Sequence, residues 1–118
     1  MEDHVMQRKS FEFAIRIVKL YQFLVAEKRE FVLSKQVLQS GTSIGANVEE
    51  AEGAISKAEF SAKMSISYKE ARETKYWLRL LHATDYLDDK SFESIFEDCD
   101  ELCKILFSIL KKSGRIRQ

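Results

Sequence analysis

The sequence predicts an all-α fold, an antiparallel up-down-up-down four-helix bundle. Its 118 residues include no proline and only four glycines, so little interrupts a helix. Apolar residues recur at alternating spacings of three and four in four successive segments with short connections. The length suits one domain, and 45% apolar and 32% charged residues are an ordinary soluble composition. We therefore expect a single domain over residues 1–118.

The first expected helix covers residues 10–28 and carries two apolar stripes side by side. The first stripe is Phe11, Ile15, Val18, Gln22 and Val25, and the second is Phe13, Ile17, Leu20 and Leu24. So wide an apolar arc contacts more than one neighbour. One of those neighbours can belong to another subunit.

The second expected helix covers residues 35–54, with the Ser34 hydroxyl as its N-cap. Its heptad-like seam is Val37, Gly41, Ile44, Val48, Ala51 and Ile55.

Residues 40–54 of this segment read SGTSIGANVEEAEGA. This run can indicate either a ligand loop or a helix whose small side chains let a neighbour pack very close. A phosphate loop also needs a Lys-Ser/Thr pair and a preceding strand, and neither is present. Close helix packing is therefore favoured, since it offsets the loss of about 1 kcal/mol of helix propensity at each glycine. The close-packing candidates are Gly41, Ser43, Gly45, Ala51 and Ala54.

The third expected helix covers residues 57–87, and the fourth covers residues 90–112. Ser56 and Glu59 match a capping box at the start of the third. Asp88 and Asp89 mark the turn and cap before the fourth, and Gly114 ends it. Residues 113–118 form a short basic tail. The expected seams are Phe60, Met64, Ser67, Ala71, Thr74, Leu78 and Leu81, then Phe92, Ile95, Cys99, Leu102, Leu106 and Ile109.

Two separated blocks resemble a known family. Residues 43–51, SIGANVEEA, resemble the S-I-x-x-N-x-x-E-[AG] signature of four-helix-bundle proteins encoded in 23S rRNA intervening sequences. Residues 69–78, KEARETKYWL, resemble the K-E-x-x-E-T-x-Y-W-L segment of many members. The similarity covers residues 11–110, with both blocks in the same order and spacing.

The resemblance implies a bundle assembled as a pentameric ring, with no known catalytic activity. The family is also similar to the accessory protein of diversity-generating retroelements. That relative is a basic pentameric barrel that associates with nucleic acid and a reverse transcriptase. Here 19 basic residues balance 19 acidic ones, so this chain differs from it in being neutral.

Polar residues beside the seams suggest a network that fixes helix register within or between subunits. Its candidate members are Asn47, Glu50, Glu70 and Glu73. Placed beside the apolar seams, such groups need partners, because leaving one unpaired costs about 1–3 kcal/mol.

A basic and aromatic arc of the third helix suggests a nucleic-acid surface. Aromatic rings among cations can stack on bases and contact phosphates. The alternative is a solvated face whose cations pair with nearby acids. The candidates are Tyr68, Lys69, Arg72, Lys75, Tyr76 and Arg79, with a second group at Lys111, Lys112, Arg115 and Arg117.

The sequence offers no convincing catalytic, metal or cofactor site. Glu70 and Glu73 have the spacing of bundle carboxylates, but no Glu-x-x-His occurs. Cys99 and Cys103 predict reduced, buried thiols rather than a disulfide. No signal peptide or membrane span is evident, so we expect a cytoplasmic protein.

Three hypotheses follow from these features. The favoured one is a non-enzymatic homo-oligomer whose first and second helices supply much of the subunit contact. The second is a nucleic-acid-binding accessory module, binding RNA or DNA. The third is a metal-dependent enzyme, which the missing ligands disfavour.

Overall fold

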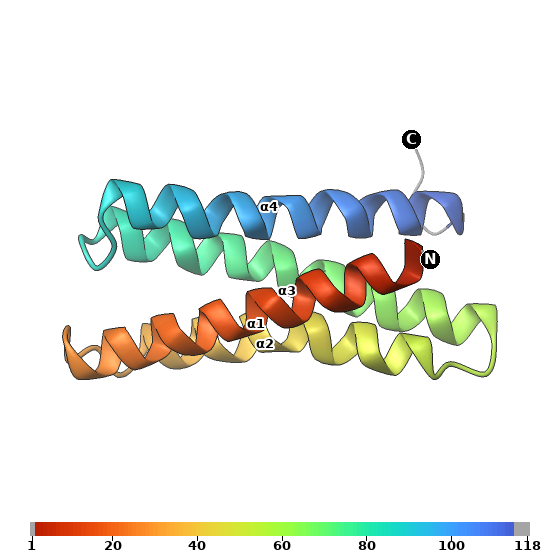
Figure 1. Ribbon diagram of the computed structural model, residues 1–118, viewed down its shortest axis with the longest axis horizontal. Helices are drawn as coiled ribbons and strands as arrows, with labels where there is room; N and C mark the ends of the chain where they lie inside the picture. Colours follow the sequence, from red (N-terminus) through yellow and green to blue (C-terminus); the bar gives the residue numbers. More distant parts are fainter. Residues whose placement is uncertain (1, 115–118) are drawn as a thin grey trace.

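The computed structural model describes residues 2–114, with side chains described from His4 onward. Four helices follow one another: α1 (Glu2–Ala26), α2 (Leu33–Glu52), α3 (Lys57–Ala83) and α4 (Asp89–Lys112). They run alternately up and down a body of 44 × 27 × 24 Å (Figure 1). Each helix packs on the next, and α1 also meets α4, though far less extensively. The predicted all-α bundle is confirmed.

The expected seams supply the core. In α1 the second apolar stripe is buried, from Phe13 to Leu24, whereas the first lies outside it. Most of the seam residues of α2, α3 and α4 are buried as expected. Ile55 was wrongly assigned to the α2 seam. It is 95% exposed, because α2 ends before it and Ile55 lies in the connection to α3.

The caps of α3 and α4 were predicted correctly, and α4 begins at Asp89, one residue earlier than expected. The Ser56 hydroxyl accepts a hydrogen bond from the Glu59 backbone N–H at 3.0 Å. The Glu59 carboxylate reaches back to the N–H of Ile55 at 2.8 Å, one residue before the expected partner. The Asp88 carboxylate accepts from the N–H of Ser91 at 2.7 Å. Both helices therefore begin where a short polar side chain satisfies free backbone donors.

The start of α2 was predicted wrongly. Ser34 is the second residue of the helix rather than its N-cap, and its hydroxyl is buried without a partner in the described part of the chain. Glu30 does the capping from the preceding turn. Its carboxylate accepts from the backbone N–H groups of Val32, Leu33 and Ser34 at 3.1, 2.9 and 2.7 Å.

Two other helix limits differ from the prediction by more than two residues. α1 already begins at Glu2, eight residues earlier than expected, because Met6 and Ser10 are buried and hold this turn against the bundle. α3 ends at Ala83 rather than residue 87, where Asp85 takes the left-handed conformation with φ +69°. In the described range, no helix is long and apolar enough to cross a membrane.

Candidate functional site

The glycine-rich run is helical, and α1 of the same chain lies against it. A Cβ atom added to Gly41 would stand 2.7, 2.8 and 2.9 Å from three side-chain atoms of Ile17. One added to Gly45 would stand 3.3 Å from the carbonyl oxygen of Ser10. These two glycines therefore lack side chains at points where α1 approaches α2 closely.

The other small residues of the run have different environments. Ala51 is buried in the core, and Ser43 is half-buried, with its hydroxyl bonded to its own helix. Ala54 lies beyond the end of α2, which stops at Glu52 rather than residue 54. Gly53 is the C-cap, with φ −93°, and nothing packs tightly against it.

The polar candidates on α2 each have a partner nearby. The Asn47 side-chain amide donates to the carbonyl oxygen of Ser43 at 2.9 Å, within the same helix. The Glu50 carboxylate pairs with the Lys63 ammonium of α3 at 2.7 Å. This ion pair spans the outer edge of the contact between α2 and α3.

The polar candidates on α3 lie on its outer side. The Trp77 indole N–H donates to the Glu73 carboxylate at 2.9 Å. Burial, and then the nearby charge of Glu73, raise the pKa of the Glu70 carboxyl. Within the described chain no hydrogen bond or ion pair joins Asn47, Glu50, Glu70 and Glu73 to one another. A network between subunits that includes them stays a prediction.

Half of the basic and aromatic arc is turned toward α4. The Lys75 ammonium pairs with the Asp100 carboxylate at 2.8 Å, and that hydrogen bond raises the pKa of Lys75. The Tyr68 ring packs against Phe107, and the Arg72 guanidinium donates to the Tyr68 hydroxyl at 3.3 Å. These three candidates therefore make contacts within the chain.

The remaining basic and aromatic candidates point to solvent. They are Lys69, Tyr76 and Arg79 on α3, and Lys111 and Lys112 in the last turn of α4. Arg115 and Arg117 lie outside the described residues. Three candidates of the α3 arc therefore stay exposed, and the described lysines of the second group belong to α4.

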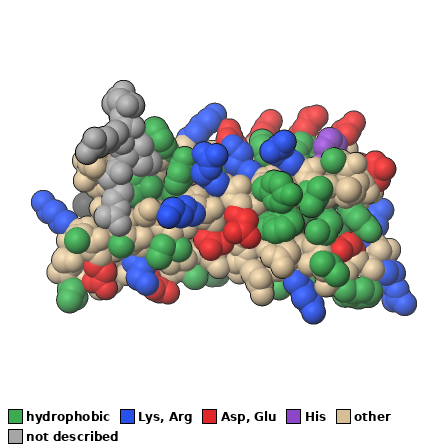
Figure 2. Space-filling view, turned by 180° about the vertical axis from the view of Figure 1, so that it is seen from behind, with side chains coloured by type: hydrophobic (Ala, Val, Ile, Leu, Met, Phe, Trp, Pro, Cys, Tyr) green, Lys and Arg blue, Asp and Glu red, His purple; other side chains and the backbone are tan. Residues whose placement is uncertain are grey.

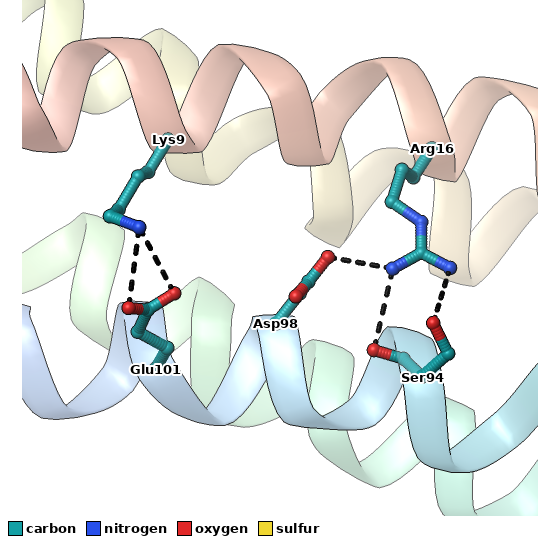
Figure 3. A network of polar contacts seen from close by, with 5 residues as sticks. All are labelled: Lys9, Arg16, Ser94, Asp98 and Glu101. Carbon is teal, nitrogen blue, oxygen red and sulfur yellow. Dashed lines mark hydrogen bonds and ion pairs between the residues drawn. The ribbon is translucent and has the colours of Figure 1, made fainter.

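Polar contacts between α1 and α4 were not predicted (Figure 3). The Arg16 guanidinium bonds the Asp98 carboxylate at 2.6 Å and the Ser94 hydroxyl at 3.0 Å. Lys9 pairs with Glu101 at 3.3 Å. Regular helix spacing gives no signal for these contacts, because the partners are about eighty to ninety residues apart in the chain.

The two cysteines are free and buried in α4. The hydrogen bond with Cys103 and burial raise the pKa of the Cys99 thiol. Cys99 Sγ also lies 3.4 Å from the carbonyl oxygen of Ala71. Across the described residues, no three His, Cys, Asp or Glu side chains are placed to hold a metal ion together.

The first apolar stripe of α1 is the most conspicuous exposed feature. Phe11, Ile15 and Val18, called the α1 stripe below, are 68, 44 and 39% exposed. Isolated apolar side chains on a surface are common, whereas large contiguous apolar patches are typical of interaction sites.

A second row lies on the outer side of α3. Ile66, Glu70, Glu73 and Trp77, called the α3 stripe below, recur at spacings of four, three and four, so they share one face. Ile66 is 42% exposed, and Trp77 is half-buried. Seen from behind, the molecule shows a cluster of hydrophobic side chains with acidic side chains beside it (Figure 2). The described chain thus presents two separate partly apolar faces.

Comparison with known proteins identifies relatives. Residues 2–108 match the family model described as 23S rRNA-intervening sequence protein. Among solved structures, the chain is similar to a protein with unknown function from the S23 ribosomal protein family of Bacteroides thetaiotaomicron VPI-5482. The identity is 57% and the TM-score is 0.92, over 94% of this chain and 99% of that chain. No match was found among curated proteins.

Proposed function

This chain belongs to the 23S rRNA-intervening sequence protein family, and we propose that it is a non-enzymatic bundle working as a homo-oligomer. The exposed α1 stripe is the observation that carries this proposal. α1 already buries its other apolar stripe in the core of its own subunit. A helix with a second apolar stripe gains from covering it, by about 25 cal/mol for each Å² of apolar surface removed from water.

A second copy of the chain is the simplest cover, because every subunit then has the same surface to cover. The resemblance to the family implies five subunits. The test is light scattering on the purified 13.7 kDa chain, at micromolar concentration and across a tenfold dilution. A mass of two or more whole chains supports the proposal, and a monomer at every concentration refutes it.

Phe11→Asp should lower that mass, because a charge would replace the most exposed ring of the α1 stripe. Glu12→Gln is a matched control at the next, exposed position of α1. Circular dichroism should show the same helicity for both variants, since neither side chain is in the core. If Phe11→Asp left the mass of the oligomer unchanged, the α1 stripe would not be part of the subunit contact.

The proposal of a non-enzymatic role is supported by the surroundings of the reactive groups. Both thiols are buried in α4, and Cys99 lies against Ala71 near the middle of α3. His82 lies in the last turn of α3, bonded to Asp89 at 2.7 Å. No nucleophile and base are therefore paired in the described chain. Elemental analysis of the purified protein tests the competing enzyme hypothesis, since stoichiometric zinc or iron would support it.

Nucleic-acid binding is a second candidate, supported by the exposed cations of α3. Lys69 and Arg79 have no ion-pair partner among the described residues, and the Tyr76 ring between them is exposed. Filter binding with single-stranded RNA and DNA at low salt tests this idea. Binding that weakens steeply with salt and is reduced by Arg79→Gln would support it. No binding at about 50 mM salt would eliminate it.

A further inference from the structure

We propose that the α1 stripe of one subunit docks on the α3 stripe of the next copy, so that the copies close into a ring with α2 nearest its axis. Two different surfaces meet in such a contact, and a rotation that closes makes it a ring. The inference rests on the proposed homo-oligomer and identifies the contact that would hold it together.

The two stripes flank α2 on neighbouring sides of the bundle. At the outer edge between α1 and α2, the side chains of Gln7 and Glu49 are hydrogen-bonded at 3.5 Å, and the α1 stripe continues the line of Gln7 along α1. At the outer edge between α2 and α3, Glu50 pairs with Lys63, and the α3 stripe continues the line of Lys63. Glu49 and Glu50 are adjacent on α2, so this helix forms the corner between both faces.

The N-terminal ends of the two stripes lie at about the same position along the long axis of the bundle. Gly45 packs against Ser10 of α1, and the neighbouring Ile44 accepts a hydrogen bond from Ser67 of α3 at 2.8 Å. Ser10 and Ser67 are therefore level with one another. Because α1 and α3 run in the same direction (Figure 1), the next residues along α1 are level with the next residues along α3.

At its C-terminal end the α1 stripe is still level with the α3 stripe, which continues as far as Trp77. Gly41 packs against Ile17, and the neighbouring Ser40 is hydrogen-bonded to Thr74 at 2.9 Å. The top of the α1 stripe is thus level with Glu73. A rotation about an axis parallel to the bundle moves no residue along that axis. In a closed ring with such an axis, the two contacting surfaces must therefore lie at the same position along it. The two stripes meet that condition, because they overlap along the bundle.

The chemistry of the two stripes is complementary. Lys19 follows directly after the α1 stripe, is exposed, and has no ion-pair partner in the described part of the chain. Along the bundle axis, Lys19 is level with the residues of α3 that directly follow Glu73. The α3 stripe presents two carboxylates, and burial and Glu73 already raise the pKa of Glu70. A cation from a second copy would offset that repulsion, while the apolar residues of both stripes cover one another.

A symmetric contact between two α1 stripes is the main alternative. It would cover the α1 stripe but leave the α3 stripe exposed. It would also leave Lys19 without an acidic partner from the α3 stripe. Cross-linking separates the two arrangements, because a symmetric contact joins a residue near its two-fold axis to itself, whereas a contact between different surfaces joins unlike residues.

The test uses two single-cysteine additions, Ile15→Cys and Glu70→Cys, at the middle of each stripe. Mild oxidation of a mixture should give a covalent dimer, whereas each variant alone should give none beyond the wild-type background. The native thiols are buried, so that background should be low. A chain carrying both changes should give a ladder that ends at the subunit number of the ring.

A charge swap provides a second measurement at exposed positions. Lys19→Glu or Glu73→Lys alone should raise the concentration for half-dissociation by roughly tenfold or more, and the double swap should restore it. Glu93→Lys on α4 is the control, since this exposed residue lies outside both stripes.

The outcomes distinguish this inference from the proposed function. Self-linking of Ile15→Cys, or a wild-type oligomer with neither the mixed cross-link nor a charge-swap effect, would overturn the docking and leave the homo-oligomer standing. A wild-type chain that stays monomeric would overturn both. The mixed cross-link together with rescue by the double swap supports both.

Discussion

Replacing Glu30 should show how much one carboxylate contributes to the start of α2. Glu30→Ala removes the acceptor of three backbone N–H groups, those of Val32, Leu33 and Ser34. Val32 is exposed, so water can replace the carboxylate there, whereas Ser34 is buried and its N–H would be left unpaired. Losing a cap costs about 0.5–2 kcal/mol, and an unpaired buried donor about 1–3 kcal/mol. We therefore expect a loss of about 2–3 kcal/mol.

The same carboxylate makes the effect depend on pH. Burial works to raise the pKa of Glu30, but the three backbone hydrogen bonds outweigh it, so the pKa lies below its ordinary value of 4.5. An acid with a lowered folded-state pKa adds stability above its unfolded pKa and loses it as pH falls. The difference between wild type and Glu30→Ala should be full at pH 7 and shrink as the pH falls through and below about 4.5.

Urea denaturation followed by circular dichroism measures this difference, at a fixed protein concentration because any self-association would change the apparent stability. Glu27→Ala is the matched control, since this exposed acid near the end of α1 caps nothing. If Glu30→Ala stayed within about 0.5 kcal/mol of wild type at pH 7, or if the difference did not fall with pH, the capping role assigned to Glu30 would be wrong.

Three further predictions concern packing, capping and the thiols. Gly41→Ala should destabilise by about 1 kcal/mol in urea, because crowding against Ile17 outweighs the gain in helix propensity, whereas Gly53→Ala should be nearly neutral; a stabilised Gly41→Ala would contradict the close approach. Ser56→Ala should cost about 1 kcal/mol by losing the hydrogen bond from Glu59, and no change in the urea midpoint would argue against this cap. Both native thiols should react with a thiol reagent only as fast as the bundle opens, and rapid reaction of folded protein would refute their burial.

Local sequence signals predicted most of the fold and the family. Ser56 and Asp88 cap the helices that immediately follow them, so a few residues suffice to predict both starts. The two family blocks in α2 and α3 correctly predicted membership. The start of α2 was missed because Glu30 acts from outside the helix. The chain first turns back at Arg29, with φ +54°, and this geometry has no simple sequence pattern.

The surfaces were harder to predict because they depend on which residues meet. Both stripes of α1 are apolar, so composition does not say which one faces the core. In the structure, the absence of a side chain at Gly41 leaves room on α2 for Ile17, so the stripe that contains Ile17 faces the core. Lys75 belonged to an expected nucleic-acid surface, yet its ammonium pairs with Asp100, twenty-five residues away. Periodicity places a side chain on a face but does not identify its partner.

The weak contact between α1 and α4 has a consequence for how quickly the chain folds. Most close packing joins helices that are consecutive in the sequence, while α1 and α4 meet far less extensively, with polar contacts such as that between Arg16 and Asp98. Little loop-closure entropy must be lost before most native contacts form. The bundle can therefore fold by adding one helix hairpin to the next. The contact between the first and the last helix can form late without lowering the folding rate.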